Sequence, residues 1–244
     1  MPPRFDPAMP LVHPLPDPER VELRAGLPYT GAGGRRLAMD LYLPAGRDPG
    51  SRLPAVLLVH GEAPPEVLRG VRGWGQYSGW GRLLAGEGLA GVAVEHRAVA
   101  EAGFDGVVAE VGAAVAYVRD RAGELGLDPG RLALAGFSAG VPLCVAALAG
   151  PAAGVRCAAL CYGPPGEVEP WPGLPPLLLV RAGQDRPELN DSIDRFVAAA
   201  QAAGLSVELV DHPDGHHAFD VLDDTDASRD AIDRVVAFLR DRLA

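Results

Sequence analysis

The sequence predicts an open α/β sheet, on the strength of three observations. Six compact apolar runs recur along the chain, as strands that are covered on both faces of a parallel sheet would. Helical segments lie between most of these runs, which is the alternation that parallel crossovers produce. With 244 residues and 48% hydrophobic side chains, the chain is long enough to bury such a sheet within one domain.

The chain begins with elements that do not belong to the parallel sheet. Residues 1–20 contain seven prolines and little periodicity, so we expect an extended, Pro-rich N-terminal arm. Two short alternating runs follow at 21–25 and 37–43, with Gly-rich residues 31–34 between them. This pattern predicts an antiparallel hairpin at the start of the folded domain.

The remaining elements follow the alternation of strand and helix. The apolar runs predict parallel strands at 55–59, 91–95, 131–135, 155–162, 177–181 and 205–211. Helical periodicity predicts helices at 76–87, 107–122, 139–149, 188–203 and 227–243. The crossover at 163–176 holds six prolines and is too short for an inserted cap domain. We therefore expect an arm at 1–20 and a single domain at 21–244.

The charge balance argues against two classes of partner. Acidic residues outnumber basic ones 32 to 22, which gives a net charge of −10, and the pI is near 5.0. Such a chain repels phosphate backbones and anionic lipid surfaces, so we expect neither nucleic acid nor membrane as a partner. All 22 basic residues are arginine, so no lysine amine is available as a nucleophile.

Three cysteines, at positions 144, 157 and 161, form a sparse set. In a strand, Cys157 and Cys161 would lie about 13 Å apart, beyond the reach of a disulfide, and no zinc spacing is present. The N-terminus lacks the pattern of a signal peptide, and no apolar run reaches the length of a membrane span. These features predict a cytoplasmic protein with buried, reduced thiols.

One motif carries a specific chemistry. Residues 136–140 read Gly-Phe-Ser-Ala-Gly, directly after a predicted strand and at the start of a predicted helix. Glycines two positions before and after Ser138 allow a sharp turn that presents the hydroxyl at the carboxyl edge of the sheet. The alternative is a Gly-rich turn in which the serine only caps the helix. The context of strand, turn and helix favours a nucleophile.

A serine nucleophile needs a base and an acid that orients it, and both should follow later strands. Asp185 follows the strand at 177–181, and His217 follows the strand at 205–211. Asp191 and Asp211 are the competing acids, and the adjacent His216 is the competing base. Phe219 is expected to anchor the histidine loop by burial.

The developing negative charge needs backbone N–H donors. We expect one donor at Ala139, which follows the nucleophile at a helix N-terminus. The second is expected in the loop His60-Gly61-Glu62-Ala63, where Gly61 permits close approach and the Glu62 amide is the predicted donor. His60 is expected to shape this loop, not to react.

Taken together, residues 20–244 resemble an α/β-hydrolase with eight strands: HG follows the third strand, GFSAG the fifth, Asp the seventh and His the eighth. The stretch Asp-Gly-His-His-Ala-Phe-Asp and the early Leu-Tyr-Leu-Pro are similar to small dienelactone-hydrolase-like and acetylesterase-like members. The resemblance implies an eight-stranded, mostly parallel sheet with helices on both faces and no cap domain. Two departures are visible. Many esterases of that branch have HGGG where this chain has HGEA, and dienelactone hydrolases use cysteine where this chain has Ser138.

Large side chains fall in the loops that should surround the site. The predicted pocket residues are Trp74, Tyr77, Phe104, Tyr162, Trp171 and Arg97. The aromatic members favour an apolar or aromatic acyl or alcohol group. Arg97 and Arg181 could hold a substrate carboxylate, although ion pairing within the protein is the commoner role of such residues.

The sequence thus predicts a serine hydrolase that cleaves small carboxylic esters through Ser138, His217 and Asp185, with an acyl-enzyme intermediate. A peptidase, thioesterase or lactonase with the same triad is the alternative, and a hydrolase-fold protein that binds a ligand without turnover is another. No metal or organic cofactor is predicted, since no ligand spacing occurs away from the triad. Homodimerisation stays open.

Overall fold

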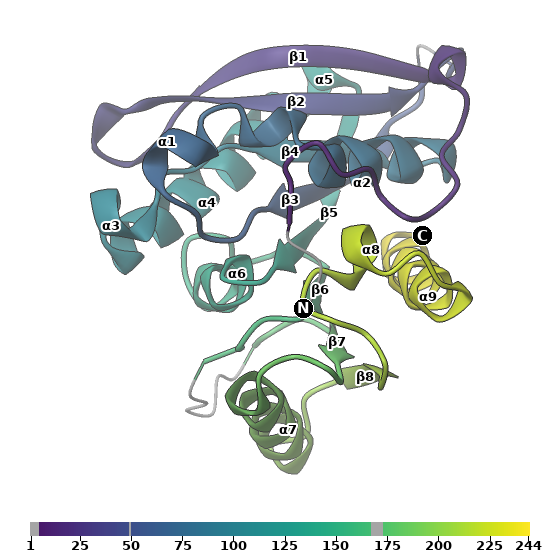
Figure 1. The fold of residues 1–244 in the computed structure, drawn as a ribbon. Helices are drawn as coiled ribbons and strands as arrows, with labels where there is room; N and C mark the ends of the chain where they lie inside the picture. Colours follow the sequence, from purple (N-terminus) through teal and green to yellow (C-terminus); the bar gives the residue numbers. More distant parts are fainter. Residues whose placement is uncertain (1–4, 49, 167–172) are drawn as a thin grey trace.

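The computed structural model describes residues 5–48, 50–166 and 173–244. Within them, eight strands form one sheet in the order β1-β2-β4-β3-β5-β6-β7-β8 (Figure 1). The strands are β1 (Val21–Thr30), β2 (Arg36–Pro44), β3 (Leu53–Val59), β4 (Ala90–Val94), β5 (Leu127–Phe137), β6 (Cys157–Cys161), β7 (Leu177–Ala182) and β8 (Val207–His212).

The hairpin and the parallel core are both as the sequence predicts. Strands β1 and β2 pair antiparallel, and β2 pairs antiparallel with β4. From β4 onward, every neighbouring pair of strands is parallel. The predicted fold class, a mostly parallel eight-stranded sheet, is therefore confirmed.

The longer helices lie close to their predicted positions. They are α2 (Gly75–Gly86), α4 (Phe104–Asp120), α6 (Gly140–Leu148), α7 (Pro187–Ala202) and α9 (Asp226–Leu243). In the described ranges, four single-turn α-helices were not predicted, because one turn is too short for a periodic apolar pattern. They are α1 (Pro65–Leu68), α3 (Val99–Ala102), α5 (Ala122–Leu125) and α8 (Phe219–Leu222). Strand β5 also begins earlier than predicted, at Leu127.

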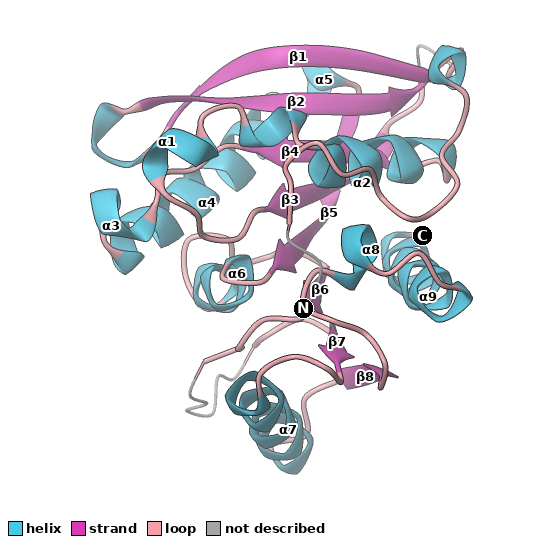
Figure 2. Ribbon diagram, viewed as in Figure 1, coloured by secondary structure: helices cyan, strands magenta, loops and turns pink. Residues whose placement is uncertain are grey.

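Helices cover both faces of the sheet (Figure 2). One buried apolar cluster joins the sheet to α4, α6 and α7, and the other joins it to α2, α8 and α9. Successive strand residues point to opposite faces, so in β3 Leu57 belongs to the first cluster and Leu58 to the second. With both faces covered, the carboxyl ends of the parallel strands remain as the edge where loops can form a site.

The described part of the N-terminal arm lies against the second face. Leu11 is buried in the cluster of α2, α8 and α9. The three cysteines are buried, as predicted, and their thiols are free in this structure. In the described residues, no helix is both long and apolar enough to cross a bilayer.

Candidate active site

Ser138 occupies a sharp turn between β5 and α6. Its φ angle is 54°, a left-handed conformation that is uncommon for a residue with a side chain. A Cβ at Gly136 would lie 2.8 Å from Cys144 Sγ, and one at Gly140 would collide with the carbonyl oxygen of Val59. The two glycines of the motif therefore allow α6 to pack against the ends of β3 and β5 while Ser138 is turned outward.

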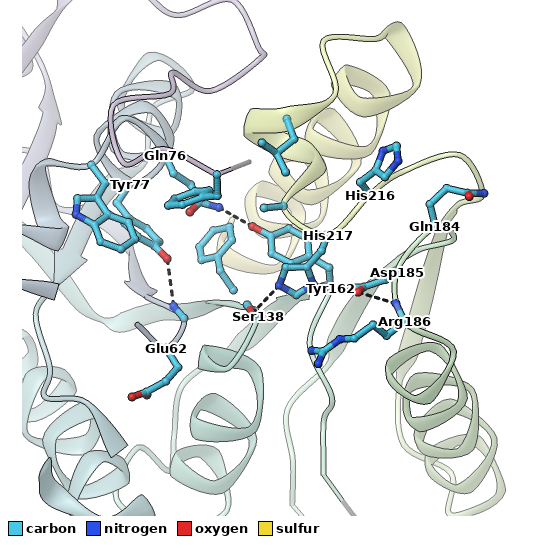
Figure 3. Close-up of a pocket in the computed structure, with 16 residues that line it drawn as sticks. Glu62, Gln76, Tyr77, Ser138, Tyr162, Gln184, Asp185, Arg186, His216 and His217 are labelled. Atoms are coloured by element: carbon cyan, nitrogen blue, oxygen red, sulfur yellow. Dashed lines mark hydrogen bonds and ion pairs between the residues drawn. The ribbon is translucent and has the colours of Figure 1, made fainter. Parts of the chain in front are cut away.

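Three side chains meet at the carboxyl edge of the sheet, from loops after three different strands (Figure 3). The Oγ of Ser138 lies 2.7 Å from Nε2 of His217. The Nδ1 of His217 lies 2.5 Å from Oδ2 of Asp185. The Asp185 side chain is only 4% exposed, and its other oxygen accepts the Arg186 backbone N–H at 2.8 Å. The arrangement links hydroxyl, imidazole and carboxylate in one chain of hydrogen bonds.

Two of the competing residues, His216 and Asp211, have other partners. The backbone N–H of His216 donates to Oδ2 of Asp223 at 2.7 Å, and its Nδ1 lies 3.0 Å from Oδ1 of the same carboxylate. Asp211 pairs with Arg181 at 3.0 Å. Of the two adjacent histidines, the structure thus brings His217 to the serine.

Two backbone amides are free to receive an oxyanion. Among the hydrogen bonds of the described residues, neither the Glu62 amide nor the Ala139 amide donates to a protein acceptor. A Cβ at Gly61 would lie 3.1 Å from Cβ of Ser138, so the loop after β3 lies directly against the nucleophile. Glu62 follows Gly61 and Ala139 follows Ser138, so each candidate donor is next in the chain to a residue that forms this close approach.

Gly61 lies close to the nucleophile, as expected from the sequence, because it has no side chain. Its N–H donates to the hydroxyl of Tyr77 at 3.1 Å and is therefore not available to an oxyanion. The Glu62 carboxylate, 3.2 Å from the Val99 amide at the start of α3, extends away from Ser138 (Figure 3).

A buried pair of histidines supports this loop. His60 and His96 stack with ring centroids 3.5 Å apart. The Nε2 of His60 accepts the His96 backbone N–H at 3.3 Å, and Nε2 of His96 lies 3.2 Å from the His60 carbonyl. Burial lowers the pKa of both rings, and for His60 the neighbouring His96 lowers it further. His60 therefore shapes the loop, in the neutral form.

The serine opens into a cavity of about 550 Å³. Trp74, Tyr77 and Tyr162 line it, at the positions where the sequence predicts pocket residues. Phe137, Leu222 and Phe5 of the N-terminal arm also line it and were not predicted. The lining combines these aromatic and aliphatic side chains with polar and charged ones, and its apolar part suits an apolar group of a ligand.

Two predicted pocket residues lie elsewhere. Phe104 begins α4 and is 41% exposed, outside the lining of this cavity. Arg97 forms an ion pair at 2.5 Å with Glu110, a carboxylate with no exposed surface, and so is held away from the cavity. Because an arginine beside a buried carboxylate pairs with it, Arg97 is not free to bind a substrate anion. Trp171 lies outside the described residues.

A buried carboxylate that the sequence did not reveal lies behind the site. Asp220 has no exposed surface and accepts hydrogen bonds from Gln76, Trp80 and Tyr162 at 2.8 to 3.2 Å. The Tyr162 ring packs edge-on against His217, with centroids 5.2 Å apart. Phe219, expected to anchor the loop, is buried against Tyr162. Asp220 thus holds the Tyr162 ring, which packs against His217.

This chain matches one family model and is similar in structure to several solved esterases. The BD-FAE family model matches residues 39–157. A bacterial heroin esterase is similar in structure, with a TM-score of 0.77 and 22% identity over 93% of this chain and 86% of that one. A fungal esterase structure from Rhizomucor miehei matches with a TM-score of 0.76 and 22% identity, over 95% and 86% of the two chains.

An esterase from Pyrobaculum calidifontis gives a TM-score of 0.73 at 22% identity, covering 95% of this chain and 88% of that chain. No curated protein matches this chain significantly in sequence. At these identities the structural matches establish the shared fold and leave the chemistry to be argued from the residues.

Proposed function

We propose that this chain, which has the α/β-hydrolase fold, is a serine esterase that hydrolyses small carboxylic esters. The observation that carries the proposal is the hydrogen-bonded chain of Ser138, His217 and Asp185, with steps of 2.7 and 2.5 Å. The esterase structures of the same fold, and the BD-FAE match, support the same reaction class.

In the first half of the reaction, Nε2 of His217 takes the proton from Ser138 as Oγ attacks the ester carbonyl carbon. Asp185 keeps the imidazole oriented and stabilises its positive charge. The amides of Glu62 and Ala139 donate to the carbonyl oxygen as it becomes an oxyanion. The C–O bond to the alcohol then breaks, and the alcohol leaves with the proton from His217.

In the second half, water replaces the alcohol. His217 removes a proton from the water, whose oxygen attacks the acyl-enzyme carbonyl. The ester bond to Ser138 breaks, Oγ recovers the proton from His217, and the carboxylic acid leaves. The substrate is a small molecule, because the cavity of about 550 Å³ has the size of a small-molecule site. Three free, buried cysteines favour the cytoplasm as the compartment of this reaction.

The nucleophile is tested by replacing Ser138 with Ala. We expect kcat for p-nitrophenyl acetate to fall by about 10³-fold or more, with the fold unchanged by circular dichroism. A fluorophosphonate should label the peptide that contains Ser138 in the unchanged chain and leave the variant unlabelled. Ser206→Ala, at an exposed serine before β8, is the matched control and should keep full activity. Ester hydrolysis at the normal rate by the Ser138 variant would contradict the proposal.

The reaction class is tested with matched substrates. Rates on an oxygen ester, a thioester, a lactone and a peptide anilide of similar acyl size should be highest for the oxygen ester. A preference for the anilide or thioester would replace esterase by peptidase or thioesterase. Binding of these compounds without turnover by the unchanged chain would identify a ligand-binding protein instead.

A further inference from the structure

The N-terminal arm follows a defined path across the molecule (Figure 1). The Pro7 carbonyl accepts the Gly75 N–H at the start of α2, at 2.8 Å. The Val12 N–H donates to the Asp220 carbonyl in α8, also at 2.8 Å, and Arg229 of α9 donates to the Val12 carbonyl at 3.3 Å. These bonds fix the arm to three helices on the same face of the sheet.

Helix α2 has glycine at three positions where the arm crosses it. A Cβ at Gly79 would lie 2.7 Å from Cβ of Leu11, and one at Gly86 would lie 3.0 Å from Cγ of Pro16. One at Gly75 would collide with the backbone of Met9. Gly79 lies inside α2, where glycine is disfavoured by about 0.5–1 kcal/mol relative to alanine. Its missing side chain leaves room for Leu11, which is buried there.

At its beginning, the described arm reaches the cavity that contains Ser138. Phe5 lines this cavity, and its ring packs against Trp74 with centroids 5.5 Å apart. Trp74 in turn lies 6.1 Å from Tyr77, and Tyr77 lies 5.6 Å from Phe137. Phe5 keeps 37% of its surface exposed, so its ring can gain further contact with a ligand. The arm thus adds the outermost member to a continuous aromatic wall.

We propose that Phe5 is a specificity-determining residue, through which the N-terminal arm selects esters whose apolar group is long enough to reach the outer wall of the cavity. The proposal rests on the proposed esterase function. Contact with Phe5 and Trp74 adds binding energy far from the scissile carbonyl, and such energy raises kcat/KM for the larger substrates. An acetyl ester of a small alcohol is too short to use this contact, so Phe5 has no effect on its hydrolysis.

The test compares substrate series in Phe5→Ala. In one series of methyl esters the acyl chain grows from acetate to octanoate, and in another the acetate is kept while the alcohol grows from methanol, so the shortest substrate of both series is methyl acetate. In the unchanged chain, kcat/KM should rise with length in at least one series. In Phe5→Ala we expect the ratio of longest to shortest substrate in that series to fall by roughly tenfold, while the rate on the shortest ester stays the same.

The matched control is Phe104→Ala. Phe104 is a phenylalanine of similar exposure, 41%, that does not line the cavity. It should leave both ratios unchanged. Phe5→Leu keeps an apolar side chain at the site and should restore part of the preference.

A second variant tests the position of the arm while the Phe5 side chain is kept. Gly79→Val places a branched side chain where the arm passes, so it should displace the arm and lower the same ratio without any change at Phe5. Equal ratios in the unchanged chain, Phe5→Ala and Gly79→Val, in both series, would overturn the proposal while esterase activity persisted. Failure of the proposed function would look different, because the unchanged chain would then hydrolyse none of the esters.

Discussion

Backbone strain in this protein is concentrated at the candidate site. In the part of the chain that the structure describes, three residues other than glycine have positive φ: Ser138 at 54°, Tyr162 at 42° and Ala218 at 61°. All three line the cavity. Such conformations cost about 1–3 kcal/mol each and persist where the surrounding structure enforces them. Here they present the serine hydroxyl, hold the ring against His217 and turn the chain directly after that histidine.

Asp220 is a main part of that surrounding structure. Burial raises the pKa of its carboxyl group, and the hydrogen bonds from Gln76, Trp80 and Tyr162 oppose that rise by favouring the charged form. A carboxylate can accept all of these bonds because it has several lone pairs and no donor. An asparagine in the same place would turn an N–H₂ group toward one of the donors.

We therefore expect Asp220→Asn to destabilise the fold and disturb the site together. Leaving buried donors without an acceptor should lower the free energy of unfolding by about 1–3 kcal/mol, measured by urea denaturation. Because Tyr162 would lose its anchor beside His217, kcat should fall more than KM changes. Asp230→Asn, at an exposed side chain of α9, is the control and should change neither quantity much. Unchanged stability and kcat in Asp220→Asn would show that the network has no such role.

The sequence predicted some of these residues and not others, for a physical reason. Ser138 stands in a motif, and Asp185 and His217 follow strands that can be recognised, so the expected sheet alone places them at one edge. Asp220 has partners 58 and 144 positions away, at Tyr162 and Gln76. Phe5 lies in an arm without periodicity. Contacts of this kind depend on how distant elements pack, which no local pattern records.

At the scale of elements, apolar runs and helical periodicity were sufficient for the strands and long helices, whereas the loops depend on tertiary contacts. The loops after β3 and β4 show this most clearly. They are joined through the stacked rings of His60 and His96, whose nitrogens bond to each other's backbone. The HG pair in the sequence indicated a loop-shaping histidine, but its partner on the next loop was not foreseen.

This histidine pair should make stability depend on pH. Burial holds the pKa of both rings below 6.5 in the folded state, whereas the unfolded chain protonates them near 6.5. Below pH 6.5 the unfolded chain therefore binds more protons. The contribution of the pair to the free energy of unfolding is therefore complete above pH 6.5. It is lost as the pH falls from 6.5 toward the lowered pKa values of the folded state, by up to about 1.4 kcal/mol per pH unit for each ring.

His96→Gln removes one titrating ring and should reduce this pH dependence. We expect the difference in unfolding free energy between pH 7 and pH 5, from urea denaturation, to be smaller in the variant than in the unchanged chain. An equal pH dependence in His96→Gln and the unchanged chain would contradict the assignment of the slope to the buried pair.

At the scale of the whole molecule, the site depends on the sheet as a single unit. Ser138 follows β5, Asp185 follows β7 and His217 follows β8, so a shift of any strand would separate groups that now lie 2.5 to 2.7 Å apart. The two apolar clusters pack against opposite faces of the same strands. Loss of packing on either face should therefore weaken the entire fold.

Adjacent residues in β3 allow this dependence to be tested. Leu57 and Leu58 are both buried, but they face different clusters. Each Leu→Ala change should lower the free energy of unfolding by about 2–5 kcal/mol. Leu23→Ala, at a side chain that is 51% exposed in β1, should change it by less than about 0.5 kcal/mol.

Two spectroscopic probes then decide whether the faces unfold together. With Trp171 replaced by Phe, the remaining tryptophans are Trp74 and Trp80, which pack into the cluster on the α2 face, whereas Leu57 faces the other one. If the sheet couples both layers, Leu57→Ala should shift the urea midpoint of tryptophan fluorescence as far as that of far-ultraviolet circular dichroism. If the layers were independent, the dichroism midpoint would move while the fluorescence midpoint stayed in place. Coincident midpoints would mean that substitutions on the face remote from the cavity can unfold the site without contacting any residue in it.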